Sequence, residues 1–197
     1  PHHEPDPTVP ANLSELIDLV RREGLDLGLA FDGDGDRLGV VDHQGTIIWG
    51  DQLLILFARE ILKTHPGATI IGEVKCSQNL YDDIPRHGGR ALMGKTGHSL
   101  IKQKMKEVRA ALAGEMSGHI FFADRYYGYD DAIYAALRLL EIVSQSGKRI
   151  PELLVGLPET IATPEIRRPI QEERKFEIVE QARRELAAHH PVADVDG

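Results

Sequence analysis

Short apolar runs alternate along the chain with longer amphipathic segments, a pattern that indicates strands alternating with helices. The runs that we expect to form buried strands are residues 25–31, 38–42, 46–48, 68–74 and 111–115. The segments that we expect to be helical are residues 12–23, 51–64, 99–108, 130–145 and 175–189. This alternation favours an α/β fold. The alternation of strands and helices divides near residues 46–51 into two blocks. A third block starts after them and contains only the beginning of such a pattern.

Two of the expected helices carry start or stop signals. Asn12, followed by Glu15 three residues later, matches a capping box, and Gly24 is suited to end the same helix. Asp51 could cap the helix that follows it. The apolar run "LLILFA" at 53–58 is too short to span a membrane and is interpreted as a buried segment.

The strongest amphipathic pattern lies in the segment 130–145. Ile133, Leu137 and Leu140 share one helical face there, which we expect to be the buried face. The stretch "YYGYDDA" just before it is interpreted as packing plus the N-cap of this helix. Four prolines over residues 151–169 indicate a linker.

Composition narrows the class of protein. The 197 residues are 42% hydrophobic and 27% charged, as in ordinary soluble domains. A net charge of −8 argues against a general nucleic-acid binder. A single cysteine, Cys76, excludes an internal disulfide framework and fits a reducing compartment. With neither a membrane-spanning run nor a recognisable signal peptide, we expect a cytoplasmic protein without nucleic-acid or membrane partners.

The stretch "FDGDGDR" at 31–37 places Asp32, Asp34 and Asp36 on alternate positions, with Arg37 directly after them. An apolar strand leads into the first aspartate, and ligands of α/β proteins bind beyond strand ends. Three carboxylates on one glycine-rich loop can converge on a hard cation, for which Mg²⁺ is the natural candidate. The guanidinium of Arg37 cannot bind a metal but suits a phosphate.

Other kinds of loop also carry closely spaced aspartates. An EF-hand needs Gly and Glu at its sixth and twelfth positions, where Arg37 and His43 stand, so it is rejected. A phosphatase with an aspartate nucleophile also uses Asp-x-Asp after a strand, usually with Thr or Val where Asp36 stands. This alternative stays open, as does a plain polar turn.

Three further motifs carry polar groups after expected strands. "GKTGHS" at 94–99 places Lys95 and His98 at a helix start, where an anion can bind, although a capped helix with solvated charges is an equal alternative. "VKCS" contributes Lys75 at a strand end, a weak signal by itself. The lysine-rich run at 102–106 is interpreted as a solvated face.

The motif "GEMSGH" at 114–119 spaces Glu115, Ser117 and His119 two residues apart. An extended or tightly turning loop could therefore aim all three to one side. Glu and Ser suit sugar hydroxyls, and His119 could transfer a proton near neutral pH. A polar turn at a strand end is the alternative.

In their order and spacing, "LAFDGDGDRLGVVD", "VKCS", "GKTGHSLIKQKMKE" and "AGEMSGHIFF" resemble the α-D-phosphohexomutase superfamily, in particular its bacterial phosphomannomutase/phosphoglucomutase branch. The resemblance implies mixed-sheet α/β domains of that type. It implies that residues 1–46 are the C-terminal part of metal-binding domain 2. Residues 47–158 would be sugar-binding domain 3, and residues 159–197 the N-terminal part of domain 4.

The resemblance also implies roles for individual residues. The Mg²⁺ ligands would be Asp32, Asp34 and Asp36. Those assigned to catalysis would be His119 as general acid/base, Arg37 near the transferred phosphoryl group, and Lys75. Those that bind the substrate would be Lys95, His98, Glu115, Ser117 and His119.

The implied reaction moves a phosphoryl group between O1 and O6 of a mannose or glucose phosphate, through a phosphoserine and a bisphosphorylated sugar. The family's serine loop and its main phosphate-binding loop have no counterpart here, so we expect the chain to be inactive alone. The alternatives are a Mg²⁺-dependent sugar phosphatase with an aspartate nucleophile and a non-catalytic module that binds metal or sugar phosphate. Glucosamine mutases usually carry Gln where Met116 stands, which favours mannose or glucose by one residue.

Overall fold

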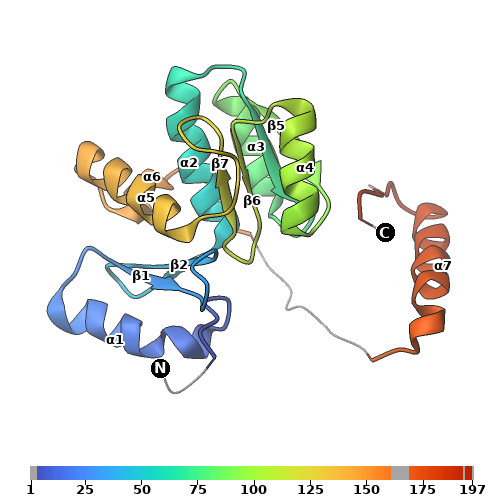
Figure 1. Ribbon diagram of the computed structural model, residues 1–197, viewed down its shortest axis with the longest axis horizontal. Coiled ribbons are helices and arrows are strands. Elements are labelled where there is room, and N and C mark those ends of the chain that lie inside the picture. Colours follow the sequence, from blue (N-terminus) through green and yellow to red (C-terminus); the bar gives the residue numbers. More distant parts are fainter. Residues whose placement is uncertain (1–3, 161–168, 193, 197) are drawn as a thin grey trace. The chain divides into compact units, whose positions relative to one another are not determined.

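The computed structural model describes residues 4–160, 169–192 and 194–196 (Figure 1). Its described residues up to Pro158 form one compact unit, and those from Glu159 onwards form a second. The strands of the first unit are β1 (Leu27–Phe31), β2 (Leu38–Asp42), β3 (Ile47–Ile48), β4 (Thr69–Glu73), β5 (Arg90–Gly94), β6 (Leu112–Gly114) and β7 (Ile120–Phe122). Its helices are a 3₁₀ turn at Pro10–Leu13, α1 (Ser14–Glu23), α2 (Gly50–Thr64), α3 (Gln78–Arg86), α4 (His98–Val108), α5 (Ala132–Ser146) and α6 (Ile150–Leu153). The second unit has a 3₁₀ turn at Glu172–Arg174 and α7 (Lys175–Ala187).

The first unit contains two sheets. Strands β1, β2 and β3 form an antiparallel sheet in that order, with α1 on one face and α5 against the other (Figure 1). The second sheet has the order β5-β4-β6-β7, in which β4 runs parallel to β5 and β6 while β7 runs antiparallel to β6. The prediction of an α/β fold with a mixed sheet is therefore confirmed.

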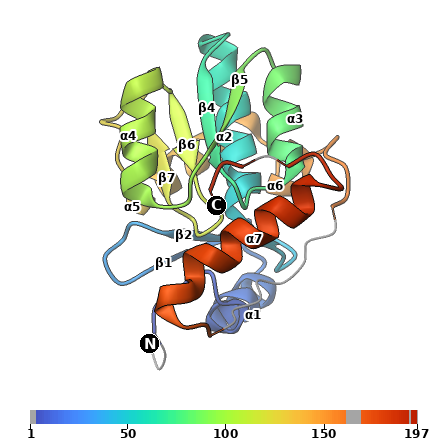
Figure 2. The same ribbon diagram turned by 90° about the vertical axis from the view of Figure 1, so that its right-hand side faces the viewer.

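Successive side chains of a strand point to opposite faces of the sheet, so the apolar strands of the second sheet place hydrophobic residues on both of its faces. On β4, Ile70 joins the main core with α2, α3 and α5, whereas Ile71 joins a smaller core under α4. Phe122 and Phe121 of β7 divide in the same way. Figure 2 shows α3 and α4 on opposite sides of these strands. The buried segment expected at 53–58 is confirmed, because it lies inside α2 and is buried throughout.

The expected capping box of the first helix is wrong, although its end is confirmed. Asn12 lies inside the 3₁₀ turn, and its side-chain amide donates to the backbone oxygens of Glu4 (3.0 Å) and Asp6 (2.9 Å). Helix α1 therefore begins at Ser14 and has no side-chain cap. Gly24 ends it in the left-handed conformation with φ 64°.

The expected cap of the second helix is also wrong. Helix α2 begins at Gly50, and the backbone N–H of Trp49 donates to the side chain of Gln52 at 3.0 Å. Asp51 lies inside the first turn, where its Oδ1 accepts from the backbone N–H of Gln52 at 2.9 Å and its Oδ2 accepts from that of Ser77 at 3.1 Å. Its carboxylate thus ties the start of α2 to the loop after β4, although Trp49 and not Asp51 is the N-cap residue.

Helix α5 reverses the expected face. Ile133, Leu137 and Leu140, expected to be buried, have exposed fractions of 61%, 60% and 41%. The buried residues of this helix are Ala132, Ala135, Ala136, Arg138, Leu139 and Ile142. Small alanines allow the helix to approach β2 and β7 closely, so they and not the larger side chains face inwards. The predicted cap is confirmed, because the Asp131 carboxylate accepts from the Tyr134 N–H at 2.8 Å.

Four elements were not predicted, namely α3, β5, β7 and α6. Helix α3 contains Pro85 near its end, and β5 is a five-residue strand that begins with the exposed Arg90 and ends with Gly94, so neither shows a clear periodicity. The expected linker at 151–169 begins inside α6, and its residues 161–168 lie outside the described part of the chain. Among the described residues, every helix falls short of the length and apolarity that a membrane crossing requires.

Candidate functional site

Three loops meet at one edge of the second sheet. The parallel strands β4, β5 and β6 end there, and they lead into residues 74–77, 95–97 and 115–119 respectively. These loops carry Lys75, the "GKTGHS" motif and the "GEMSGH" motif. Because parallel strands bring their carboxyl ends to one edge, motifs far apart in sequence become neighbours.

The aspartate loop reaches this edge from the other sheet. The strand expected before Asp32 is present as β1, but β1 and β2 are antiparallel, so the rule that places ligands beyond the ends of parallel strands does not apply to this loop. Contact with the "GEMSGH" loop positions it instead. The backbone N–H of Leu38 donates to the oxygen of Gly118 at 3.0 Å, and Arg37 forms an isolated antiparallel bridge with His119.

The three aspartates converge as expected. One carboxylate oxygen from each of Asp32, Asp34 and Asp36 lies within 4.8 Å of the others. The loop curls because Gly35 takes φ 78°, a conformation that favours glycine. Asp32 is only 8% exposed, and its Oδ1 accepts backbone hydrogen bonds from Gly35 (3.0 Å), Asp36 (3.0 Å) and Arg37 (3.1 Å).

Arg37 is held inside the loop by two carboxylates. Its Nε donates to Asp32 Oδ2 at 2.7 Å, and its Nη1 lies 3.1 Å from Asp6 Oδ1. Burial opposes ionisation of Asp32, but hydrogen bonds from the Arg37 guanidinium and from backbone amides outweigh it and lower the pKa of Asp32 to about 2. The Asp32 hydrogen bond in turn raises the pKa of Arg37. The two carboxylates therefore hold this guanidinium in one orientation.

Asp36 has the opposite electrostatic character. Burial raises its pKa, and the neighbouring Asp32 and Asp34 raise it further, while His119 opposes the shift. Its Oδ1 lies 3.7 Å from the Nδ1 of His119. The donor set is all oxygen and closely spaced, and the repulsion within it would be relieved by a divalent cation. These residues therefore fit Mg²⁺.

Glu115 is buried and already hydrogen-bonded. Its Oε1 accepts from the backbone N–H of Gly97 at 2.7 Å, and its Oε2 accepts from the Ser117 hydroxyl at 3.3 Å. The carboxylate thus joins the "GEMSGH" loop to the "GKTGHS" loop. Lys95 lies exposed on the latter. The Lys75 ammonium is half exposed and lies 3.6 Å from the carboxylate of Glu73.

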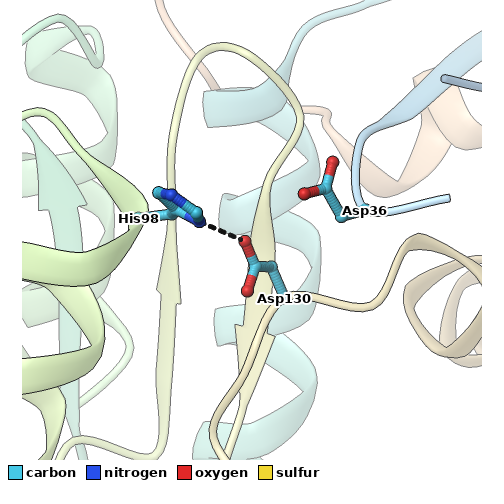
Figure 3. Close-up of side chains that lie close together, drawn as sticks. All are labelled: Asp36, His98 and Asp130. Atoms are coloured by element: carbon cyan, nitrogen blue, oxygen red, sulfur yellow. Dashed lines mark hydrogen bonds and ion pairs between the residues drawn. The ribbon is translucent and has the colours of Figure 1, made fainter. Parts of the chain in front are cut away.

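A pair of histidines lies between these loops and the aspartates. The rings of His98 and His119 stack with centroids 5.7 Å apart and 28° between their planes. The Nδ1 atom of each lies 3.2 Å from Asp130 Oδ2, and Lys102 Nζ donates to Asp130 Oδ1 at 3.0 Å. Figure 3 shows Asp130 between His98 on one side and Asp36 on the other.

Three of these residues were missed from the sequence. Asp130 was assigned to packing before the long helix, Lys102 was assigned to a solvated face, and Glu73 was passed over inside an apolar strand. Lys102 is in fact partly buried against Asp130, which corrects the interpretation of the lysine run. A carboxylate inside an apolar strand was the available signal for Glu73, since buried charges need partners. Nothing local marks Asp130.

The fold and the site define a phosphohexomutase-type α/β protein, in which an aspartate loop lies against the "GEMSGH" loop of the second sheet. Comparison with known families agrees with this class. The alpha/beta/alpha domain III of phosphoglucomutase/phosphomannomutase matches residues 49–161, and domain II of the same proteins matches residues 1–45. The chain belongs to the phosphoglucomutase/phosphomannomutase family.

Individual relatives agree. The chain is 54% identical over 185 residues to a phosphomannomutase/phosphoglucomutase of Pseudomonas putida, covering 94% of this chain and 40% of that protein. It therefore spans less than half the length of this curated relative. A crystal structure of a phosphoglucomutase/phosphomannomutase family protein from Burkholderia thailandensis superposes with a TM-score of 0.79 at 52% identity, covering 83% of this chain and 36% of that one.

A more distant structure shares the fold alone. An Aspergillus fumigatus N-acetylphosphoglucosamine mutase, solved in complex with GlcNAc-6P and magnesium, superposes with a TM-score of 0.56 at 17% identity. The match covers 66% of this chain and 32% of that one. At this identity the comparison supports the arrangement of strands and helices and not the roles of individual residues.

Proposed function

We propose that this chain supplies the metal-binding and sugar-binding parts of a phosphohexomutase, which interconverts the 1-phosphate and 6-phosphate of mannose or glucose in the cytoplasm. The observation that carries the proposal is the contact of the aspartate loop with the "GEMSGH" loop through the Leu38–Gly118 hydrogen bond. The names of the relatives and the hexose phosphate bound to the A. fumigatus protein support it. We also propose domain boundaries near residues 46 and 158.

In this proposal Asp32, Asp34 and Asp36 hold Mg²⁺, which when bound neutralises charge on the transferred phosphoryl group. Asp32 keeps its charge because its hydrogen bonds favour the ionised form. Arg37, fixed by two carboxylates, presents its remaining N–H groups to a phosphoryl oxygen. The loop thereby orients the group to be transferred.

The sugar would lie across the loops of the second sheet. Ser117 and Glu115 would bind ring hydroxyls, and His98 and Lys95 would contact the bound sugar phosphate. Lys75, half exposed at the end of β4, would place a positive charge near the transferred group. His119 would take the proton of the attacking hydroxyl and return it when the direction of transfer reverses.

The reaction we propose conserves one phosphoryl group per cycle. A phosphoserine outside this chain donates its phosphoryl group to the free O1 or O6 hydroxyl of a hexose phosphate, and that hydroxyl loses its proton to His119. The resulting bisphosphate reorients in the site, so that its other phosphate faces the serine. The serine then accepts the phosphoryl group from the other position, which leaves the isomeric hexose monophosphate.

A coupled assay of the complete protein that contains this chain tests the proposal. We expect turnover of mannose or glucose 1-phosphate with Mg²⁺, and none by the 197-residue chain alone. Phosphate on the enzyme should resist hydroxylamine, as a serine ester does and an aspartyl phosphate does not. Turnover by the isolated chain, or a hydroxylamine-labile label on Asp32, would overturn it. Binding without turnover by the complete protein would support the non-catalytic alternative.

The sugar preference is tested by comparing kcat/KM for mannose, glucose and glucosamine 1-phosphates. We expect glucosamine 1-phosphate to be the poorest substrate. Met116 precedes Ser117 in the proposed hydroxyl-binding loop, and its side chain offers no strong hydrogen bond to an amino group. A preference for glucosamine 1-phosphate would contradict this assignment without affecting the proposed class of reaction.

A further inference from the structure

Asp130 occupies a fixed position between three elements. Its backbone forms an isolated bridge with Phe121 in the middle of β7, and the next residue, Asp131, caps α5. The backbone N–H of Ala132 donates to the oxygen of Gly35 in the aspartate loop at 3.0 Å. The side chain of Asp130 is only 6% exposed, so its carboxylate needs partners.

Those partners are all cationic or can become so. Lys102 Nζ donates to Asp130 Oδ1 at 3.0 Å. The Nδ1 atoms of His98 and His119 each lie 3.2 Å from Asp130 Oδ2. The contact with His98 is a hydrogen bond. The contact with His119 has the length of a hydrogen bond but not its alignment, so the buried Nδ1 of His119 has Asp130 as its nearest carboxylate without a formed hydrogen bond.

The surroundings of His119 favour one placement of its proton. Nδ1 is fully buried and faces two carboxylates, Asp130 at 3.2 Å and Asp36 at 3.7 Å. A bare nitrogen lone pair at this place would face oxygen lone pairs, so a proton on Nδ1 is favoured. In the neutral ring Nε2 is then left without a proton and can accept one. Stacking on His98 limits tilting of the ring.

We infer that Asp130 is a positioning residue that fixes the ring orientation and the Nδ1–H tautomer of His119, leaving Nε2 to accept the proton of the sugar hydroxyl. Only the use made of Nε2 rests on the proposed function. Lys102 holds the Asp130 carboxylate in place from the side of α4. The geometry thus assigns a role to a residue whose side chain contacts the two histidines and Lys102 and lies within 4.8 Å of Asp36.

A structural role is the competing explanation, in which Asp130 does no more than anchor α4 through Lys102. Two substitutions separate the two explanations. Lys102→Met removes the anchor and leaves the carboxylate beside the histidines. Asp130→Asn keeps the shape but can present an amide N–H to Nδ1, which favours the other tautomer.

The kinetic test uses the complete protein. We expect Asp130→Asn to lower kcat on the order of 10- to 100-fold, with KM changed less than about threefold. Lys102→Met should lower kcat by less than about threefold, because the carboxylate still faces His119. Asp131→Asn is the matched control, since Asn caps a helix as well as Asp does. Wild-type kcat in Asp130→Asn, or equal losses in Asp130→Asn and Lys102→Met, would overturn the inference.

A second measurement reads the proton position in the wild-type protein itself. Nitrogen-15 NMR of histidine-labelled wild-type protein, at a pH where the rings are neutral, reports which ring nitrogen carries the proton. The signals of His119 are assigned by their loss in His119→Asn. We expect the Nδ1–H form, and an Nε2–H form would overturn the inference. Absence of mutase activity in the wild-type protein would overturn the proposed function. The observed tautomer of His119 would still show whether Asp130 fixes its proton on Nδ1.

Discussion

The Glu73 carboxylate accepts a hydrogen bond from the Thr96 hydroxyl at 2.6 Å, and this contact joins the ends of β4 and β5. Glu73 is completely buried. Its other oxygen accepts from the backbone N–H of Met116 at 2.9 Å, in the loop after β6. One buried carboxylate therefore fixes all three loops that carry the candidate sugar contacts.

Replacing Glu73 with Met should remove the acceptor of the Met116 N–H and the link to the Thr96 hydroxyl. An unsatisfied buried donor costs about 1–3 kcal/mol, so we expect the free energy of unfolding to fall by roughly 1–3 kcal/mol. Glu73→Gln is the matched control, because its amide can still accept from Met116 and donate to the Thr96 hydroxyl. Urea unfolding of the chain measures both, and equal losses would contradict the role given to Glu73.

Substitutions of Asp34 and Asp32 should affect Mg²⁺ affinity and the free energy of unfolding differently. Asp34 is exposed, so Asp34→Asn should lower Mg²⁺ affinity about tenfold and leave the unfolding free energy within about 0.5 kcal/mol of wild type. Asp32→Asn should lower both, since Asp32 Oδ1 accepts three backbone hydrogen bonds. Titration calorimetry measures the affinity, with Asp26→Asn as the control on an exposed aspartate outside the loop. Unchanged affinity in Asp34→Asn would argue against a three-aspartate site.

Asp32 should also shape the response to acid. Its pKa in the folded chain is about 2, below the ordinary value of 3.8, so the stability it contributes is complete above the unfolded pKa. That contribution, up to about 2 kcal/mol, should be lost as the pH falls from about 4 towards 2. We expect Asp32→Asn to lose less stability than wild type over this window.

The raised pKa of Asp36 acts in the opposite direction, since its contribution to stability declines as the pH rises, and Asp32 is one cause of that shift. Making the comparison in chains that also carry Asp36→Asn removes this second contribution and isolates Asp32. Chemical unfolding at a series of pH values measures the difference. Parallel acid profiles of the chains with and without Asp32→Asn would show that the hydrogen bonds of Asp32 do not hold its pKa down in solution.

The reversed face of α5 gives a direct contrast. Leu139 is fully buried, and Leu139→Ala should cost about 2–4 kcal/mol through lost packing and the cavity left behind. Leu137 is 60% exposed, so Leu137→Ala should change stability by less than about 1 kcal/mol. Thermal unfolding of the two variants measures the contrast. A larger loss in Leu137→Ala would indicate that this face is covered in solution.

The sequence predicted those features that depend on neighbours along the chain. The aspartate loop is recognisable because spacing and charge are local, and the end of α1 follows from Gly24, which alone tolerates the left-handed turn at low cost. The cap of α5 by Asp131 is local in the same sense. The face of α5 was misjudged because apolar residues occur on both of its sides, and only the distance to the sheet decides that the small alanines face inwards.

What the sequence by itself determined is a set of loops with the chemistry for a cation, an anion and a sugar, in the order typical of one family. Only the tertiary structure decided how they meet. The parallel arrangement of β4, β5 and β6 gathers three loops at one edge, and Glu73 joins them. The contact between Asp130 and His119 links the start of α5 to the loop before β7, and it arises from how the helices pack on the sheet. No local pattern encodes such packing, because it depends on residues far apart in the chain.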